Sequence, residues 1–220
     1  YNEGKVSGAT SGTGENAGGL VGWANQIILT GYNQGEVSGN QYVGGLLGND
    51  QGGSTIKGYN TKNVSGKSYV GGLAGAARTG STVTGYNTGD VTGTGYHVGG
   101  LLGWATNLTV TGYNTGDVTG TGYYVGGLLG WATNLTVTGY NEGKVSGATS
   151  GTGENAGGLV GFANHVNLTG YNQGEVSGNK YVGGLVGQAN NSSTITGYNT
   201  GNVRGTGYSV GGLAGAASNG

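Results

Sequence analysis

The amino-acid sequence predicts an all-β fold, a parallel β-solenoid (β-helix) of about eight coils of 27–31 residues. Three observations support this prediction. The dipeptide Tyr-Asn recurs at a nearly fixed period, apolar residues occupy the same places in every repeat, and no segment has the apolar spacing of a helix. A fixed period in this range is typical of solenoids, propellers and arrays. Stacked parallel strands lie about 4.8 Å apart, so eight coils predict a rod roughly 38 Å long.

The repeat unit begins at Tyr-Asn and returns after 31 or 27 residues. The coils start at Tyr1, Tyr32, Tyr59, Tyr86, Tyr113, Tyr140, Tyr171 and Tyr198. The sequence of the first coil returns at Tyr140, so five coils make a super-repeat of 139 residues. We therefore expect residues 1–220 to form a single continuous solenoid segment that belongs to a longer array.

Three apolar positions recur in each complete coil. A valine is the sixth residue, a leucine follows a Gly-Gly pair, and a third apolar residue precedes the end of the coil. Val118, Leu128 and Val137 are these residues in the fifth coil. Short β-branched segments separated by glycine indicate strands and turns. The pattern predicts about three short strands around a thin core, with Val118 and Leu128 pointing inward.

The composition excludes several classes of protein. Glycine supplies 57 of 220 residues, while Pro, Cys and Met are absent. Glycine without proline and without a Gly-X-Y period excludes collagen, and the lack of cysteine excludes disulfides. A net charge of −1 removes the electrostatic basis for binding nucleic acid. No run of about 18 apolar residues exists, so the sequence predicts no membrane span.

Two kinds of polar column run through the repeat. Asparagine follows the first tyrosine of every coil, and stacking would let each amide hydrogen-bond to the next. These residues are Asn2, Asn33, Asn60, Asn87, Asn114, Asn141, Asn172 and Asn199. Tyrosine forms one column at the coil starts, and the sequence indicates a second column at Tyr42, Tyr69, Tyr96, Tyr123, Tyr181 and Tyr208.

The Gly-Gly-Leu core of each coil carries a family resemblance. Gly-Gly-Leu-Val-Gly at 18–22 and 157–161, Gly-Gly-Leu-Leu-Gly at 44–48, and the flanking YNTGDVTG at 86–93 resemble the GLUG motif. That motif occurs in repeat regions of large bacterial surface proteins, including adhesins and immunoglobulin A-cleaving metalloproteases. The resemblance covers essentially the whole chain and implies an extracellular β-solenoid stalk or adhesive segment. It implies no catalysis, because the zinc motif H-E-x-x-H of the metalloproteases is absent.

The titratable residues do not indicate an enzyme. His97 and His165 occupy different positions in different coils, and no cysteine accompanies them. The fifth position of successive coils alternates in charge, which indicates ion pairs along a solvated face, with Asp90 beside Asp117 as a repulsive step. A calcium bridge at Asp90 and Asp117 is the alternative, since calcium takes several oxygen ligands. Otherwise the sequence predicts no metal and no cofactor.

Aromatic residues and threonines supply candidate contact surfaces. Trp104 and Trp131 occupy equivalent places in adjacent coils, where they either cover the core or form a platform for sugars or other fibres. Threonine pairs in the pattern T-ϕ-T, among them Thr109 with Thr111 and Thr136 with Thr138, resemble the flat faces of ice-binding solenoids but equally fit β-propensity. Tyr86 and Tyr113 complete this candidate contact surface.

The sequence therefore favours a structural or adhesive extracellular fibre segment, a repeat solenoid that forms a stalk or filament at the cell surface. The alternative is an ice-binding or glycan-binding solenoid that uses its Thr or Trp/Tyr ladders. The expected partners are further copies of the same repeats, through self-association into fibres, and surface glycans. We expect an extracellular or cell-surface location.

Overall fold

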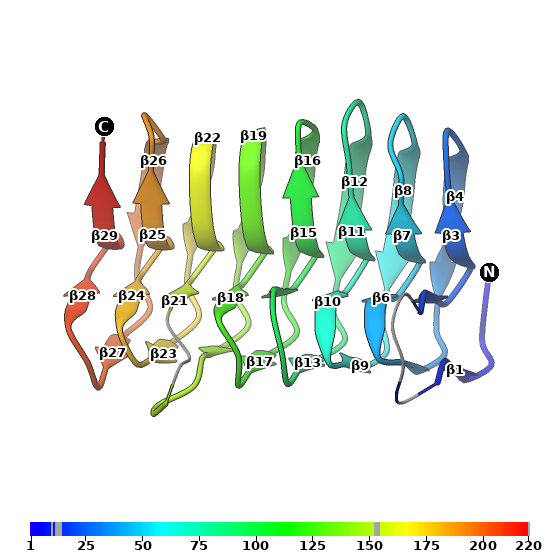
Figure 1. Ribbon diagram of the computed structural model, residues 1–220, viewed down its shortest axis with the longest axis horizontal. Helices are drawn as coiled ribbons and strands as arrows, with labels where there is room; N and C mark the ends of the chain where they lie inside the picture. Colours follow the sequence, from blue (N-terminus) through cyan, green and yellow to red (C-terminus); the bar gives the residue numbers. More distant parts are fainter. Residues whose placement is uncertain (10, 12–14, 152–154, 220) are drawn as a thin grey trace.

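A computed structural model describes residues 1–9, 11, 15–151 and 155–219. It confirms the predicted fold class: within these ranges the chain is all-β, without a helix, and all strand pairs are parallel. Coils follow one another along a single axis, with the N-terminus at one end of the stack and the C-terminus at the other (Figure 1). The chain forms no helix in these ranges that could span a membrane.

Sheet 1 contains the short strand that carries the recurrent valine. Each strand pairs with its counterpart in the next coil in strict register, as Val91 does with Val118. Its eight strands are β1 (Val6–Ser7), β5 (Val37–Ser38), β9 (Val64–Gly66), β13 (Val91–Gly93), β17 (Val118–Gly120), β20 (Val145–Ser146), β23 (Val176–Gly178) and β27 (Val203–Gly205).

Sheet 2 follows a corner and ends in the first glycine of the Gly-Gly pair. A second valine column, in which Val70 pairs with Val43 and Val98, faces the valines of sheet 1. Its eight strands are β2 (Ala17–Gly18), β6 (Gln41–Gly44), β10 (Ser68–Gly71), β14 (Val98–Gly99), β18 (Tyr124–Gly126), β21 (Asn155–Gly157), β24 (Tyr181–Gly183) and β28 (Ser209–Gly211).

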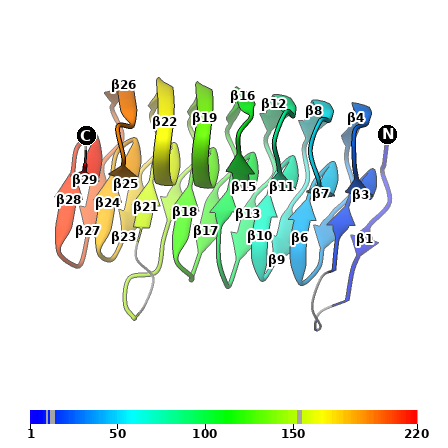
Figure 2. The same ribbon diagram turned by 45° about the horizontal axis from the view of Figure 1, so that its top comes forward.

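Sheet 3 has 13 strands and contributes two segments per coil, which we call 3a and 3b. Segment 3a contains β3 (Val21–Ala24), β7 (Leu47–Asp50), β11 (Ala74–Ala77), β15 (Leu102–Thr106), β25 (Val186–Asn190) and β29 (Ala214–Ser218). Segment 3b contains β4 (Ile28–Asn33), β8 (Thr55–Asn60), β12 (Thr82–Asn87), β16 (Thr109–Asn114) and β26 (Thr194–Asn199). In β19 (Leu129–Asn141) and β22 (Val160–Asn172) the corner between the segments is itself strand, and Figure 2 shows these two as unbroken ribbons.

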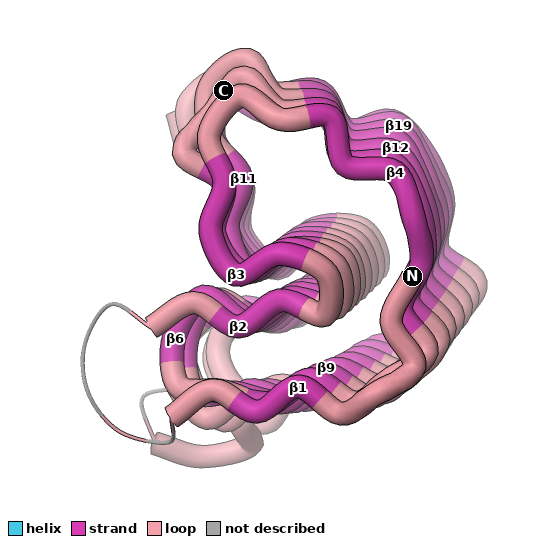
Figure 3. The backbone as a smooth tube through the Cα atoms, turned by 90° about the vertical axis from the view of Figure 1, so that its right-hand side faces the viewer, coloured by secondary structure: helices cyan, strands magenta, loops and turns pink. Residues whose placement is uncertain are grey.

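Seen along the axis, each coil turns inward between sheet 2 and segment 3a (Figure 3). This turn is the Gly-Gly-Leu motif, and its leucine is buried in the larger of two cores together with the apolar residues of sheet 3, among them Leu128 and Val137. The smaller core lies between sheets 1 and 2 and is built of valines such as Val118 and Val125. Val118 and Leu128 point inward as predicted, but the expected single thin core is wrong: the inward turn divides it in two.

The Gly-Gly pair is required by how closely this turn approaches its neighbours. A Cβ atom on Gly45 would lie 2.2 Å from the carbonyl oxygen of Gly72 and 2.5 Å from Cγ of Asn60. A Cβ atom on Gly44 would lie 2.1 Å from the carbonyl oxygen of Leu47. No side chain fits at these separations, so the motif is dictated by contact with the next coil rather than by a ligand.

Val118 lies in the middle of the stack and is fully buried between the valines of adjacent coils. Val118→Asp places an unpaired carboxylate in the smaller core, so we expect a loss of at least about 3 kcal/mol in the free energy of unfolding. Urea denaturation followed by circular dichroism measures it. The control is Thr119→Asp, because Thr119 is exposed on the same strand. Equal stability of the two variants would contradict the inward assignment of Val118.

Candidate functional site

The asparagine column forms a continuous hydrogen-bonded ladder inside the solenoid. Each side-chain Nδ2 donates to Oδ1 of the asparagine in the next coil at 2.7–2.8 Å, through all seven steps from Asn2 to Asn199. The same Nδ2 donates to the backbone carbonyl two residues further on, as Asn114 does to Gly116 at 2.7 Å. Asn114 and its neighbours in the ladder are fully buried, and both amide protons have acceptors.

The tyrosines that precede these asparagines form a second axial column, on the outer surface. Consecutive rings stack with centroids 4.8–5.2 Å apart and planes within 7° of parallel. Tyr86 and Tyr113 are one such pair, at 5.0 Å. The pKa of Tyr86 is raised above its usual value. Burial against the neighbouring rings is the main cause, and the adjacent tyrosines raise it further. Tyr86 therefore stays uncharged across the neutral range.

Asn114 tests how much the buried ladder stabilises the stack. Asn114→Ala removes two donor bonds and deprives Asn87 Nδ2 of its acceptor, so buried polar groups on both sides lose partners. We expect a loss of about 3 kcal/mol or more in the free energy of unfolding, measured from urea midpoints at unchanged m-value. Asn2→Ala is the matched control, because Asn2 is partly exposed and accepts no bond from a preceding rung. Equal losses of unfolding free energy in the two variants would show that burial inside the stack adds nothing to the stabilisation by the ladder.

The threonine pairs of segment 3b lie on the outer surface beside the tyrosine stack. Thr109 pairs with Thr136 and Thr111 with Thr138, in register, and all four are exposed. Together with Tyr113 they lie on the outer side of segment 3b over adjacent coils, and none of these side chains carries a charge. The structure thus brings these predicted contact residues together on one face.

The threonine columns are interrupted away from the centre of the stack. Lys57 takes the place of a threonine beside Thr84, and Asn167 does so beside Thr136. At the N-terminal end, Ile28 opposes Thr55 and is largely exposed. The regular threonine surface therefore spans only three consecutive coils.

Asp90 and Asp117 belong to a ladder of backbone hydrogen bonds on the surface beside sheet 1. Asp90 Oδ1 accepts the backbone N–H of Asp117 at 3.0 Å, and Asp117 Oδ1 accepts that of Lys144 at 2.9 Å. Asn63 Oδ1 accepts the N–H of Asp90 in the same way. Each of the two carboxylates thus accepts a backbone hydrogen bond from the next coil. Within the described ranges no group of three or more His, Asp or Glu side chains is arranged to hold a metal ion.

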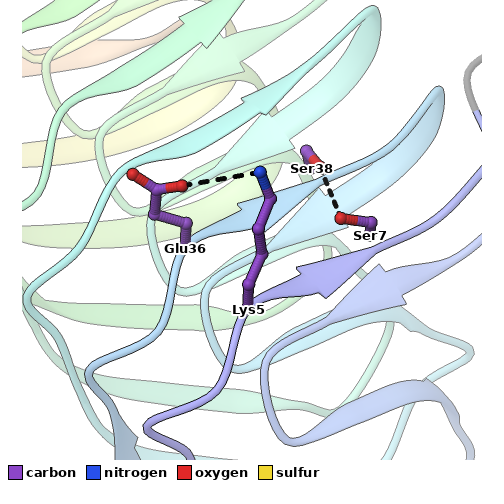
Figure 4. Close-up of polar contacts among 4 residues, drawn as sticks. All are labelled: Lys5, Ser7, Glu36 and Ser38. Carbon is purple, nitrogen blue, oxygen red and sulfur yellow. Dashed lines mark hydrogen bonds and ion pairs between the residues drawn. The ribbon is translucent and has the colours of Figure 1, made fainter.

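Among the described residues, ion pairs along this face include Lys5 with Glu36 and Arg204 with Glu175. Lys5 Nζ lies 3.7 Å from a carboxylate oxygen of Glu36, next to a hydroxyl contact between Ser7 and Ser38 (Figure 4). Arg204 lies 3.6 Å from Glu175. These pairs are largely exposed and contribute little stability individually.

The second tyrosine column differs from the prediction. Tyr69 is aligned with Tyr42 in the preceding coil and with His97, not Tyr96, in the following one, because Val70 pairs with both Val43 and Val98. Beyond His97 the column continues through Tyr124, Asn155, Tyr181 and Ser209. Tyr96 and Tyr123 stack with each other one residue earlier in the chain. An extra residue in the first loop of these coils shifts the tyrosine, which an alignment from the coil start misses.

Trp104 and Trp131 pair on adjacent rungs of segment 3a, as expected. Trp131 stacks on Phe162 at 4.1 Å and contacts Tyr124 edge-on. Trp104 instead lies beneath the guanidinium of Arg78, 4.9 Å from its ring centroid. Both indoles are half-buried, so they cover the core and also present a surface.

A concave site lies where sheet 2 meets segment 3a, and sequence reasoning missed it. We call it the Arg78 notch; its volume is about 410 Å³ and it is lined by Tyr42, Tyr69, Arg78, His97, Trp104 and Trp131, with Thr106 and Thr133 at its edge. Figure 3 shows the inward bend of the coil outline between these elements. The sequence feature that could have indicated this site is Arg78, one of two arginines in the chain, which lies in a corner next to the tryptophan column.

His97 is packed among aromatic rings at the floor of this notch. It contacts Tyr69 at 5.0 Å and Trp131 at 5.3 Å, and burial lowers its pKa to about 4. Its Nδ1 is buried and has no hydrogen-bond partner in the described part of the chain. The neutral imidazole therefore behaves as one more aromatic wall at physiological pH.

This environment makes stability depend on pH. The pKa of His97 is about 4 when folded and about 6.5 when unfolded, so the unfolded chain binds the additional proton between these values and stability falls as the pH decreases. We expect acidification from pH 7 to 5 to lower the free energy of unfolding by about 2 kcal/mol through this group.

The chain offers a matched control for this effect, because the coils that start at Tyr86 and Tyr113 differ only in having His97 where the second has Tyr124. His97→Tyr makes them identical and should remove this part of the pH dependence. Thermal melts of both proteins from pH 7 to 5 measure the difference. Parallel pH profiles would contradict the burial of His97.

No family model, curated protein or solved structure matches the chain.

Proposed function

We propose that the chain is a structural, adhesive segment of an extracellular fibre, in which the solenoid forms a stalk or filament at the cell surface. The observation that carries the proposal is axial continuity. Three parallel sheets, the buried asparagine ladder and the tyrosine stack all pass from coil to coil in register. The resemblance to GLUG-motif repeats of bacterial surface proteins supports the location.

The C-terminal face of the stack supports further coils as the partner. Val210 and Leu213 are each 46% exposed there, whereas Val182 and Leu185, one coil inward, are fully buried. Strand edges of the same coil carry backbone groups that would pair with another strand. A further coil of this type, from the same chain or from another copy, matches both the apolar and the hydrogen-bonding character of this face.

The outer surface favours close association of such rods. A net charge of −1 over 220 residues causes little mutual repulsion. The stacked tyrosines offer an extended amphipathic strip for many weak contacts between fibres. Repetition of the same contact along a rod multiplies its effect, which suits adhesion.

The proposal is tested by raising the concentration of the protein. We expect growth into thin, unbranched fibres, seen by sedimentation velocity and negative-stain electron microscopy, with a meridional diffraction spacing of about 4.8 Å. Leu213→Lys places a charge on the stacking face and should shorten the fibres. Thr119→Lys, on an exposed side position, should leave their length unchanged. Monodisperse short rods at high concentration, or equal effects of the two variants, would overturn axial stacking.

A further inference from the structure

We propose that the Arg78 notch is a binding site for an acidic sugar, a pyranose carrying a carboxylate. This goes beyond the proposed structural function and does not depend on it. The site combines aromatic walls, one unpaired cation and hydroxyl groups within a single concave surface. Its volume of about 410 Å³ lies in the usual range for small-molecule sites.

The aromatic walls suit the apolar face of a sugar ring. Tyr42 and Tyr69 stack at 4.7 Å on the sheet 2 side, and Trp104 and Trp131 lie on the segment 3a side. All four rings line the notch and are half-buried, so part of each ring can contact a ligand. Aromatic residues in a concave site give large contact areas at low cost in side-chain entropy.

Arg78 supplies the charge, and the protein holds it in place. Its guanidinium lies 4.9 Å from the Trp104 ring centroid and 6.0 Å from that of Tyr42. One terminal nitrogen, Nη1, donates to Asn49 Oδ1 at 2.5 Å and to the Asp50 carbonyl at 2.9 Å. In the described part of the chain the other N–H groups of the guanidinium have no acceptor, so they are available for a carboxylate.

The carboxylate that lies closest in sequence to these contacts, that of Asp50, forms no ion pair with Arg78. Asp50 is fully buried and its two side-chain oxygens accept hydrogen bonds from Ser54 Oγ at 2.6 Å and from Ser81 Oγ at 2.5 Å. Gly52 N–H donates to the same group. Among the described residues Arg78 therefore forms no ion pair, and its positive charge is directed to the notch.

Hydroxyl groups at the edge fit a polyhydroxylated ligand. Thr133 Oγ1 accepts the indole N–H of Trp131 at 2.8 Å, which leaves its own proton to donate. Thr106 pairs with Thr133 on the neighbouring coil. The notch thus offers a charged donor at one place and neutral hydroxyls at another, as an acidic sugar requires.

Three residues that line the notch have a left-handed backbone conformation, which also occurs at Gln26, Asn107, Asn134 and His165 elsewhere in the coils. Tyr42, Tyr69 and His97 have φ values of 45°, 54° and 55°, in the left-handed region that non-glycine residues seldom adopt. Strained residues cluster at binding sites when the surrounding structure holds them there. Here three of the residues that form the wall and floor of the notch share this conformation, although it also recurs at the corner between segments 3a and 3b.

The second copy of the super-repeat lacks the site, although it keeps the scaffold. The position of Arg78 is occupied there by Ser218, which pairs with Asn190, and that of Tyr69 by Ser209, which pairs with Tyr181. The charge and one of the two tyrosines of the wall are therefore replaced. The proposal therefore requires one binding site per chain, and a stoichiometry of two would contradict it.

The experiment titrates the full chain with D-galacturonic acid and N-acetylneuraminic acid, followed by tryptophan fluorescence and calorimetry. D-galactose tests the need for the carboxylate, and acetate tests the need for the sugar ring. We expect saturable one-site binding of an acidic sugar, at least about tenfold tighter than either control. Equal binding of galactose or acetate, or no saturable binding of the acidic sugars, would overturn the proposal.

Two arginine variants complete the test. Arg78→Gln removes the charge and should weaken binding of the acidic sugar by about tenfold or more. Arg204→Gln is the matched control, since Arg204 is exposed beside Glu175 on another face, and it should bind as the unaltered chain does. Arg78→Lys keeps the charge but not the planar fork, and its denaturation midpoint shows whether the fold is retained. Equal affinity of Arg78→Gln and Arg204→Gln would overturn the assignment.

Discussion

In-register stacking is the constraint on which the rest of this structure depends. Each residue lies directly over its counterpart in the next coil. A side chain is therefore accommodated in the interior only if it can pack against, or hydrogen-bond to, a similar side chain at the same position of the neighbouring coil. The carboxamide of asparagine meets this requirement because it carries both a donor and an acceptor, and Asn87, Asn114 and Asn141 use both. A buried carboxylate repeated at the same position would repel its copy. Asp50, a fully buried carboxylate, lies beside Ala24 of the preceding coil instead of a second carboxylate, and it accepts hydrogen bonds from serine hydroxyl groups.

The glycine content follows from the same constraint. The inward turn touches both the asparagine ladder and the turn of the next coil, and Gly127 faces Asn141 and the carbonyl of Gly158 at distances that exclude a Cβ atom. In segment 3b, a Cβ atom on Gly112 would lie 1.9 Å from the carbonyl oxygen of Gly85. The Gly-Gly-Leu turn therefore connects the asparagine ladder to the larger core. Its leucine is buried in that core, while its glycines permit close approach to the ladder and to the turn of the next coil.

The periodicity was sufficient to predict the fold class, the coil starts and the inward direction of Val118 and Leu128. It did not reveal the division into two cores, because the inward turn brings together segments that the periodicity alone does not place side by side. It also placed Tyr96 in the wrong column. One added loop residue separates Tyr96 from Val98, so Tyr96 no longer aligns with Tyr69 of the preceding coil. The Arg78 notch was missed for a related reason: Tyr42 and Trp104 are 62 residues apart and belong to different columns, and only the folded corner makes them neighbours.

The contrast between the two copies of the super-repeat separates scaffold from site. Residues that maintain stacking are present in both copies: Asn60 and Asn199 extend the same ladder, and Tyr59 and Tyr198 the same stack. The residues of the notch are not equivalent in the two copies, because Ser218 stands at the place of Arg78. Side chains on the outer corners are partly exposed, so they can differ from coil to coil without leaving a buried group unpaired. A solenoid of this kind can therefore acquire a single asymmetric site on a repetitive rod, and the corners between sheets are where such sites are structurally permitted.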